Sequence, residues 1–271
     1  MKISVIQMNS QANKAENIAQ ARRLIAEAVK EDRPDIVVLP EMFTHLGGSL
    51  EQRREAAEEI PGGEAYRALQ DAARTHKVVV HGGSFYERAP DGYFNTTVAF
   101  GPDGQEIARY RKIHLFDVTT PDGREYKESA TVGRGDQLVT YKVGDVTVGC
   151  SICYDLRFGE LYRALAEKGA QVIMLPAAFT LQTGKDHWEP LIRARAIETE
   201  TFFCASAQVG SHAQGNDTRY TWGHSMIVDP WGQVLAQASD GQGFATARID
   251  LDYLKDVRQK IPVHQHRVLG A

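Results

Sequence analysis

The fold is decided by the stretch Val146-Thr-Val-Gly-Cys150-Ser-Ile-Cys153-Tyr154-Asp155-Leu-Arg157. Apolar residues alternate from Val146 to Ile152, which predicts a strand that stops where Cys153 begins. A helix is predicted from Gly159 to Lys168. A side chain at the carboxyl end of a strand, at the turn into a helix, faces the crevice in which open α/β sheets bind ligands. Cys153 therefore stands where a nucleophile would lie, close to backbone N–H groups that stabilise a thiolate or an oxyanion.

Short strands and helices alternate outward from this stretch along the whole chain. This rhythm, with no low-complexity linker or break in composition, predicts one α/β domain with mixed sheets covered by helices. Two predicted hairpins turn at x-Pro-x-Gly, at Gly101–Gly104 and Asp229–Gly232, which favours a duplicated half-domain. Strands are predicted at 2–8, 35–39, 78–80, 97–100, 107–110, 138–143, 146–152, 171–175, 202–207, 225–228, 233–238 and 244–249. Helices are predicted at 14–30, 64–76, 159–168 and 188–200, with a short one from Leu251.

The composition is that of an ordinary globular protein. Of the 271 residues, 42% are hydrophobic and 24% are charged, which excludes intrinsic disorder as the main description. The 31 basic and 35 acidic residues nearly cancel, so neither nucleic acid nor a membrane surface is an expected partner. No apolar run approaches the roughly 18 to 20 residues that span a bilayer. No hydrophobic leader follows Lys2, so a cytoplasmic protein is expected.

The three cysteines, Cys150, Cys153 and Cys204, are too few and odd in number for a disulfide framework, which fits a reducing compartment. Cys150 and Cys204 lie inside predicted strands and are expected to be small buried apolar residues. The Cys150-x-x-Cys153 spacing also admits a redox pair or a zinc site. Strand alternation turns Cys150 away from Cys153, and no second cysteine or histidine pair completes a zinc site. Thiol chemistry at Cys153 alone is therefore favoured.

Two further strand ends carry charged residues. Glu41 follows the predicted strand at 35–39, and Lys112 follows the strand at 107–110. Taken singly, each is more simply explained as a solvated loop charge. Together with Cys153 they match the needs of carboxamide hydrolysis, which are a nucleophile, a base that passes its proton to departing ammonia, and a cation for the tetrahedral oxyanion.

These residues stand in motifs that resemble the nitrilase superfamily of carbon–nitrogen hydrolases. The family's order and spacing are found in Leu39-Pro40-Glu41, in Tyr110-Arg111-Lys112-Ile113-His114-Leu115 and in Cys153-Tyr154-Asp155-Leu156-Arg157-Phe158. Segments 183–198 and 223–232 are similar to its amidase branch. The resemblance implies an α/β fold, the α-β-β-α sandwich of nitrilase-like proteins, as a single carbon–nitrogen hydrolase domain over residues 1–271. It also implies a homodimer or higher homo-oligomer, with the C-terminal tail, about 251–271, as a candidate dimer contact.

The resemblance assigns roles residue by residue. Glu41 becomes the general base, Lys112 the stabiliser of the oxyanion, and Cys153 the nucleophile that forms a thioester. Glu128 corresponds to the family's further glutamate, which would orient Lys112 and help to place the substrate. A surface charge beside Lys127 is the alternative for Glu128.

Two more expectations concern the residues that follow the cysteine. The backbone N–H of Tyr154 is the expected second oxyanion donor. An ion pair between Asp155 and Arg157 is expected to fix the turn, with loop solvation as the alternative.

The amidase branch implies hydrolysis of the terminal carboxamide of a small dicarboxylic or 2-oxo acid, with water as the second substrate and ammonia released. Deaminated glutathione or an ω-amide of a 2-oxo acid is favoured. The alternatives are an N-carbamoyl compound or a nitrile hydrolysed by the same trio and, more remotely, a noncatalytic interaction protein on this fold. Phe179 and His187 are candidate substrate contacts, although Phe179 equally suits the core. With no Gly-rich phosphate loop and no clustered metal ligands, no cofactor and no metal are expected.

Overall fold

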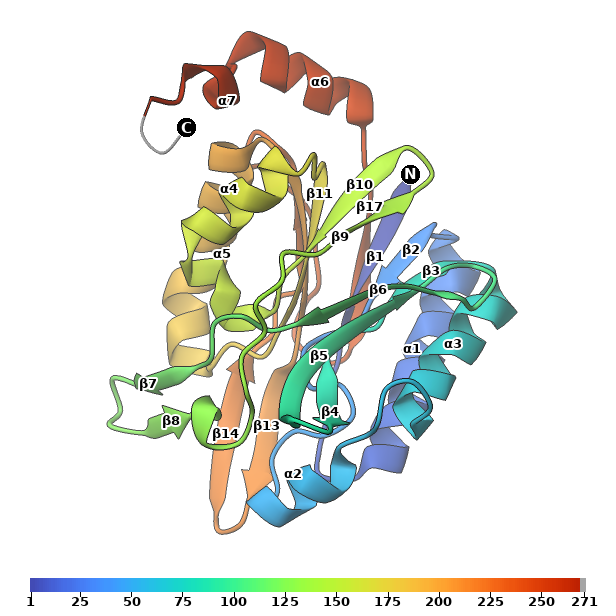
Figure 1. Cartoon of the computed structure of the whole chain (residues 1–271), viewed down its shortest axis with the longest axis vertical. Coiled ribbons are helices and arrows are strands. Elements are labelled where there is room, and N and C mark those ends of the chain that lie inside the picture. Colours follow the sequence, from blue (N-terminus) through green and yellow to red (C-terminus); the bar gives the residue numbers. More distant parts are fainter. Residues whose placement is uncertain (269–271) are drawn as a thin grey trace.

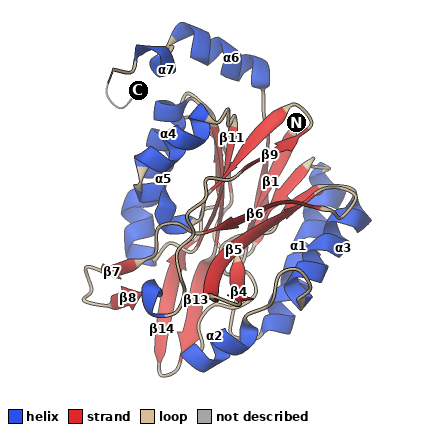
Figure 2. Ribbon diagram, in the orientation of Figure 1, coloured by secondary structure: helices blue, strands red, loops and turns tan. Residues whose placement is uncertain are grey.

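Two β-sheets lie face to face, and helices cover the outer face of each (Figure 1 and Figure 2). The computed structural model describes residues 1–268. Side chains from both sheets meet between them, where Ile3 and Val5 of the first sheet share one buried core with Val148 and Cys150 of the second. A second core lies between the first sheet and its helices, because alternate strand residues point to opposite faces. The predicted α-β-β-α sandwich is confirmed.

The first sheet comes mainly from the N-terminal half of the chain. Helices α1 (Lys14–Asp32) and α3 (Glu64–His76) cover its outer face. The Asn13 side chain caps α1 by accepting a hydrogen bond from the Glu16 N–H, as the spacing of the two residues predicts. The strand order is β17 (Gly243–Arg248), β1 (Lys2–Gln7), β2 (Ile36–Val38), β3 (Val79–His81), β5 (Gly92–Phe100) and β4 (Phe85–Ala89), and β6 (Glu106–Arg111) also pairs with β5.

The second sheet comes from the C-terminal half. Helices α4 (Gly159–Glu167) and α5 (Leu181–Thr199) cover its outer face (Figure 1). The strand order is β16 (Val234–Gln237), β15 (Met226–Val228), β12 (Phe202–Ala207), β11 (Val172–Ala177), β10 (Val146–Cys150) and β9 (Thr140–Val143).

The two sheets repeat one strand order. Strands β1, β2 and β3 are parallel neighbours and are followed by antiparallel β5 and β6, while β10, β11 and β12 are parallel and are followed by antiparallel β15 and β16. Each final hairpin turns at its x-Pro-x-Gly segment, where Gly104 and Gly232 have φ of 81° and 82°. Glycine adopts this left-handed region without steric cost. This repetition agrees with the duplicated half that the sequence predicts.

Shorter elements lie at the two ends of the sandwich (Figure 1). One end carries α2 (Leu50–Ala56) with the hairpins β7 (Asp117–Thr119)–β8 (Glu125–Lys127) and β13 (Val209–Gln214)–β14 (Asp217–Trp222). The opposite end carries α6 (Leu251–Lys260) and α7 (Val263–His266). Two 3-10 turns, η1 (Glu128–Ala130) and η2 (Cys153–Arg157), adjoin the cavity described below. No helix within residues 1–268 is long and apolar enough to cross a bilayer.

The structure differs from the predicted boundaries at α5 and β10, and it adds the hairpin β13–β14. Helix α5 begins at Leu181 and not at Trp188, although Pro190 then lies inside it. Proline at position 190 removes one helical hydrogen bond, but the buried stripe of Gly184, Trp188 and Ile192 runs through it, so tertiary packing outweighs the local cost. Strand β10 ends at Cys150, two residues before the predicted end. The hairpin β13–β14 has no predicted counterpart.

Candidate active site

Three chain segments bring the predicted trio to one cavity. Glu41 follows β2 and Lys112 follows β6, both in the first sheet, while Cys153 follows β10 in the second. All three side chains are buried and line a cavity of about 310 Å³. The nucleophile, the carboxylate and the cation that the sequence proposes separately are therefore neighbours in the fold.

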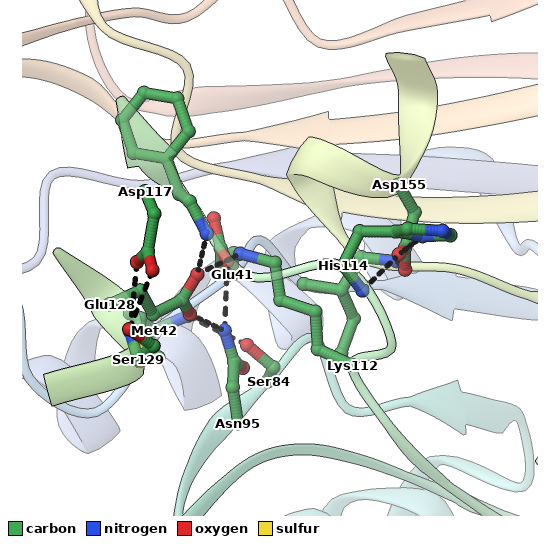
Figure 3. A network of polar contacts seen from close by, with 12 residues as sticks. Glu41, Met42, Ser84, Asn95, Lys112, His114, Asp117, Glu128, Ser129 and Asp155 are labelled. Atoms are coloured by element: carbon green, nitrogen blue, oxygen red, sulfur yellow. Dashed lines mark hydrogen bonds and ion pairs between the residues drawn. The ribbon is translucent and has the colours of Figure 1, made fainter. Parts of the chain in front are cut away.

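The Lys112 ammonium joins two carboxylates (Figure 3). Its Nζ donates to Glu41 Oε1 at 2.9 Å and to Glu128 Oε2 at 2.8 Å. Burial alone would lower the pKa of Lys112, but the negative charges of Glu128 and Glu41 outweigh it and hold that pKa well above its ordinary value. Lys112 therefore remains a cation across the whole physiological range.

A buried amide on strand β5 completes this network and was not predicted. The Asn95 Nδ2 donates to Glu41 Oε1 at 2.9 Å and to Glu128 Oε1 at 3.1 Å (Figure 3). The backbone carbonyl of Asn95 accepts from the Lys112 backbone N–H. Asn95 thus fixes both carboxylates and the backbone of the lysine. The sequence signal that points to it is an asparagine within the strand-forming stretch Gly92–Phe100, and the structure shows that its side chain is fully buried.

Glu128 and the turn that begins with it are held in place by the segment that follows Lys112. Its Oε2 accepts from the Phe116 N–H at 2.7 Å, and the next residue, Ser129, donates through its N–H and Oγ to the Asp117 carboxylate at 3.0 and 2.5 Å. These contacts with Asp117 fasten η1 to the segment that follows Lys112. Glu128 is therefore a fixed partner of Lys112 and not a solvated surface charge.

Cys153 lies at a strained turn three residues beyond the end of β10. Its φ of 47° falls in the left-handed region that non-glycine residues rarely adopt, which is typical of functional sites. Burial raises the pKa of the Cys153 thiol well above its ordinary value, and the charge of Glu41 and a hydrogen bond to Glu41 raise it further. Lys112 and a hydrogen bond from the Ala178 backbone act in the opposite direction. The thiol is therefore protonated at neutral pH and needs a base in order to attack.

Comparison with known proteins identifies the family of this chain. The family model of carbon-nitrogen hydrolases matches residues 2–259. The chain belongs to the carbon–nitrogen hydrolase family. It is 44% identical over 270 residues to a deaminated glutathione amidase from Synechocystis sp., covering 98% of this chain and 97% of that protein. It is 38% identical over 267 residues to an omega-amidase from Danio rerio, covering 98% and 94% of the two chains.

The solved structure of the Caenorhabditis elegans NitFhit protein has the same fold. It superposes with a TM-score of 0.88 at 35% sequence identity, and the match covers 98% of this chain but 64% of that longer chain. This carbon–nitrogen hydrolase is thus an amidase of the nitrilase superfamily, which hydrolyses carbon–nitrogen bonds other than peptide bonds in small amides with water. Membership of the family also decides against the noncatalytic alternative.

One predicted contact of the hydrolase is wrong. Asp155 makes no ion pair with Arg157 and instead accepts hydrogen bonds from the Tyr110 hydroxyl at 2.7 Å, the His114 N–H at 3.1 Å and the Ile152 N–H at 2.8 Å. The His114 ring nitrogen lies 2.8 Å away as well. Asp155 points into the protein beneath the turn, whereas Arg157 points to the cavity. Side chains two residues apart on a tight helical turn face different directions, so sequence proximity does not bring them together.

The structure also separates the two candidate substrate contacts. Phe179 lines the cavity and packs against Trp188, with 5.0 Å between ring centroids, so it belongs to both the wall and the core. His187 is exposed on α5 and is not part of the cavity wall, which corrects the prediction. Its Nδ1 lies 3.4 Å from the Arg157 guanidinium. The reason is the earlier start of α5, which turns Gly184 and Trp188 inward and leaves His187 on another face.

Three arginines that the sequence did not single out as binding residues line the cavity. They are Arg53 on α2, Arg157 on η2 and Arg219 on β14. No carboxylate oxygen of residues 1–268 lies within 4.0 Å of their guanidinium nitrogens. In the same part of the chain, no group of three or more His, Cys, Asp or Glu is placed to hold a metal ion. The cavity therefore offers free cations around a Glu–Lys–Cys centre.

Proposed function

We propose that Cys153 attacks the carbonyl carbon of a small carboxamide and forms a thioester, with Glu41 as the general base. The observation that carries this proposal is the meeting of three groups in one cavity. The Lys112 ammonium lies 2.9 Å from Glu41, and Glu41 lines the same cavity as Cys153, close enough for its charge to raise the pKa of the thiol. Glu41 is thus placed to take the thiol proton when sulfur attacks.

The proton moves in a closed cycle through Glu41. In the first half-reaction Glu41 takes the proton from Sγ, the carbon–sulfur bond forms, and the tetrahedral oxyanion is stabilised by Lys112 and the Tyr154 backbone N–H. Glu41 then gives the proton to the leaving nitrogen as the carbon–nitrogen bond breaks. In the second half-reaction Glu41 takes a proton from water, hydroxide attacks the thioester, and the proton returns to Cys153 as the carboxylic acid leaves.

Glu128 and Asn95 act on this cycle through other residues. Glu128 accepts from Lys112 and Asn95 donates to Glu41, so the pair fixes the direction of both catalytic side chains. Preorganisation of this kind lowers the barrier because the charges need not reorient during the reaction. Phe179 supplies an apolar wall against which the acyl chain of the substrate would lie.

The proposed substrate is an amide of a small dicarboxylic or 2-oxo acid. Similarity to a deaminated glutathione amidase and an omega-amidase supports it. The two favoured substrates, an ω-amide of a 2-oxo acid and deaminated glutathione, differ in the group that leaves. An ω-amide of a 2-oxo acid releases ammonia, while deaminated glutathione holds its amides between residues and releases an amine. The same trio also permits an N-carbamoyl compound, which releases carbon dioxide as well, or a nitrile.

The test is a substrate panel in which the acid product is measured by mass spectrometry and ammonia by a coupled assay. It contains deaminated glutathione, α-ketoglutaramate, α-ketosuccinamate, an N-carbamoyl amino acid and a nitrile. Cys153→Ala should abolish turnover and Glu41→Gln should prevent acylation. Cys204→Ala is the matched control, because this buried thiol lies in β12 outside the cavity. Turnover that survives in folded Cys153→Ala protein would exclude the mechanism.

We further propose a cytoplasmic homodimer, or higher homo-oligomer, of one-domain chains. The free buried cysteines support a reducing compartment. Exposed apolar side chains support self-association, among them Ile197 on α5, Trp231 and Leu235. The predicted tail contact covers 251–268 here, since residues 269–271 lie outside the described part of the chain. A monomer found by light scattering would contradict the oligomer. Two separate unfolding transitions would contradict the single domain. Cell fractionation tests the proposed cytoplasmic location.

A further inference from the structure

Two of the three cavity arginines come from segments that are fastened to each other. Arg53 lies on α2 and Arg219 on β14, and the Gly48 N–H before α2 donates to the Ala213 carbonyl of β13 at 2.9 Å. In Figure 1, α2 and the β13–β14 hairpin lie at the same end of the sandwich. A chain separation of more than 160 residues is thus bridged so that two guanidinium groups face one cavity.

Neither guanidinium is neutralised by the protein. The nearest carboxylate to Arg219 in the hairpin, that of Asp217, is already paired with Arg124 at 3.0 Å. Glu125 also lines the cavity, but it forms no ion pair within 4.0 Å with either guanidinium group. Glu41 and Glu128 are both engaged by Lys112. Within residues 1–268, then, Arg53 and Arg219 have no anionic partner at ion-pair distance.

Placing the Arg219 guanidinium at this position without a bound ligand is unfavourable in free energy. Its guanidinium lies over the Tyr126 ring, 4.4 Å from the centroid, and its Nε is buried with no hydrogen-bond partner in the described chain. Burial lowers the pKa of Arg219, and the like charge of Arg53 lowers it further, while Tyr126 and Asp217 act in the opposite direction. A bound anion would accept a hydrogen bond from the buried donor. It would also reduce the repulsion between the two positive charges that face the cavity.

We propose that Arg53 and Arg219 form an anion subsite that binds a carboxylate of the substrate away from the scissile amide. Arg157 is set apart from it, because its guanidinium contacts His187 and lies 5.5 Å from the centroid of the Phe179 ring. The subsite rests on the proposed amidase function and narrows its substrates to amides that carry a carboxylate. A planar guanidinium binds a carboxylate through two parallel hydrogen bonds, which explains why arginines are used here.

The experiment compares Arg53→Gln and Arg219→Gln with wild-type protein on three amides. Two are anionic and of different length, α-ketoglutaramate and deaminated glutathione, and one is neutral, pentanamide. For at least one anionic amide we expect each variant to raise KM roughly ten- to a hundredfold, with a much smaller change in kcat. The ratio of kcat/KM for the anionic amide to that for pentanamide should fall at least tenfold. Arg219→Lys, which keeps the charge, should recover part of the loss.

Arg22→Gln is the matched control, because Arg22 is exposed on α1 outside the cavity. Equal losses on anionic and neutral amides, or no loss on either anionic amide, would overturn the subsite. Calorimetric titration with 2-oxoglutarate measures binding to the subsite directly and does not depend on turnover. Binding that weakens at least tenfold in both variants supports the subsite even if the wild-type protein hydrolyses none of the amides, which would contradict the proposed function alone. Unchanged binding in the variants overturns the subsite whatever the turnover.

Discussion

The Lys112 ammonium lies 2.9 Å from the Glu41 carboxylate although 71 residues separate them in the chain. Glu128 holds the other side of the ammonium, so two carboxylates share one cation and one negative charge remains beside Cys153. Burial of the thiol and this residual charge both raise its pKa, so the thiol stays protonated until Glu41 removes its proton. The arrangement leads to separate expectations for the cation, for the amide that fixes it and for the thiol.

Lys112→Met should reduce kcat by about a hundred- to a thousandfold, because the oxyanion loses its charged partner. The same change leaves Glu41 and Glu128 as buried carboxylates without a cation, which should lower the free energy of unfolding by roughly 3 to 5 kcal/mol. Steady-state kinetics and urea unfolding measure the two effects. Lys30→Met, at an exposed position of α1, is the control. A folded Lys112→Met protein with wild-type kcat would contradict the assignment.

Asn95→Leu should lower kcat about ten- to a hundredfold and change KM much less, since Asn95 positions Glu41 and Glu128 and does not line the cavity. Asn95→Asp should lower kcat further, because a third carboxylate would then face the other two. Kinetics of both variants at several substrate concentrations separate kcat from KM. If KM alone rises in both, Asn95 acts on substrate binding and not on the catalytic side chains.

The thiol of Cys153 should react slowly with iodoacetamide at neutral pH. An acid whose pKa is raised stays protonated to higher pH, so the alkylation rate should still be low at the ordinary cysteine value of 9.0 and should keep rising above it without levelling off. In Lys112→Met the rise should move to still higher pH, because the ammonium lowers the thiol pKa. Mass spectrometry of the modified peptide measures the rate. A sigmoidal increase centred below pH 8 would show that a thiolate is already present.

Asp155→Ala should destabilise the fold by roughly 2 to 4 kcal/mol, because the Tyr110 hydroxyl and the backbone N–H groups of Ile152 and His114 lose their buried acceptor. Arg157→Ala should cost less than about 1 kcal/mol, since Arg157 shares no hydrogen bond with Asp155. Urea unfolding of the two single variants and the double variant measures this difference. A coupling energy between the two substitutions well above zero would show that Asp155 and Arg157 interact, which would contradict the geometry described above.

The sequence by itself determined the layered α/β fold, and it singled out the three residues that we propose as the reactive trio. Alternating apolar residues specify strands locally, and the position of Glu41, Lys112 and Cys153 just beyond strands places them at sheet edges, where side chains of different strands converge. Such information is local, so it is readable from short stretches. It also explains why Cys150 and Cys204, inside strands, are buried.

Only the tertiary structure decided which groups surround that trio. Asn95 reaches two carboxylates from the middle of a strand, Asp155 turns away from Arg157 beneath its turn, and α5 runs through Pro190 because its buried stripe outweighs a local cost. Arg53 and Arg219 become neighbours of one cavity through a hairpin and a loop joined by backbone hydrogen bonds. Contacts between residues far apart in the chain depend on the packing of whole elements, and no local pattern encodes them.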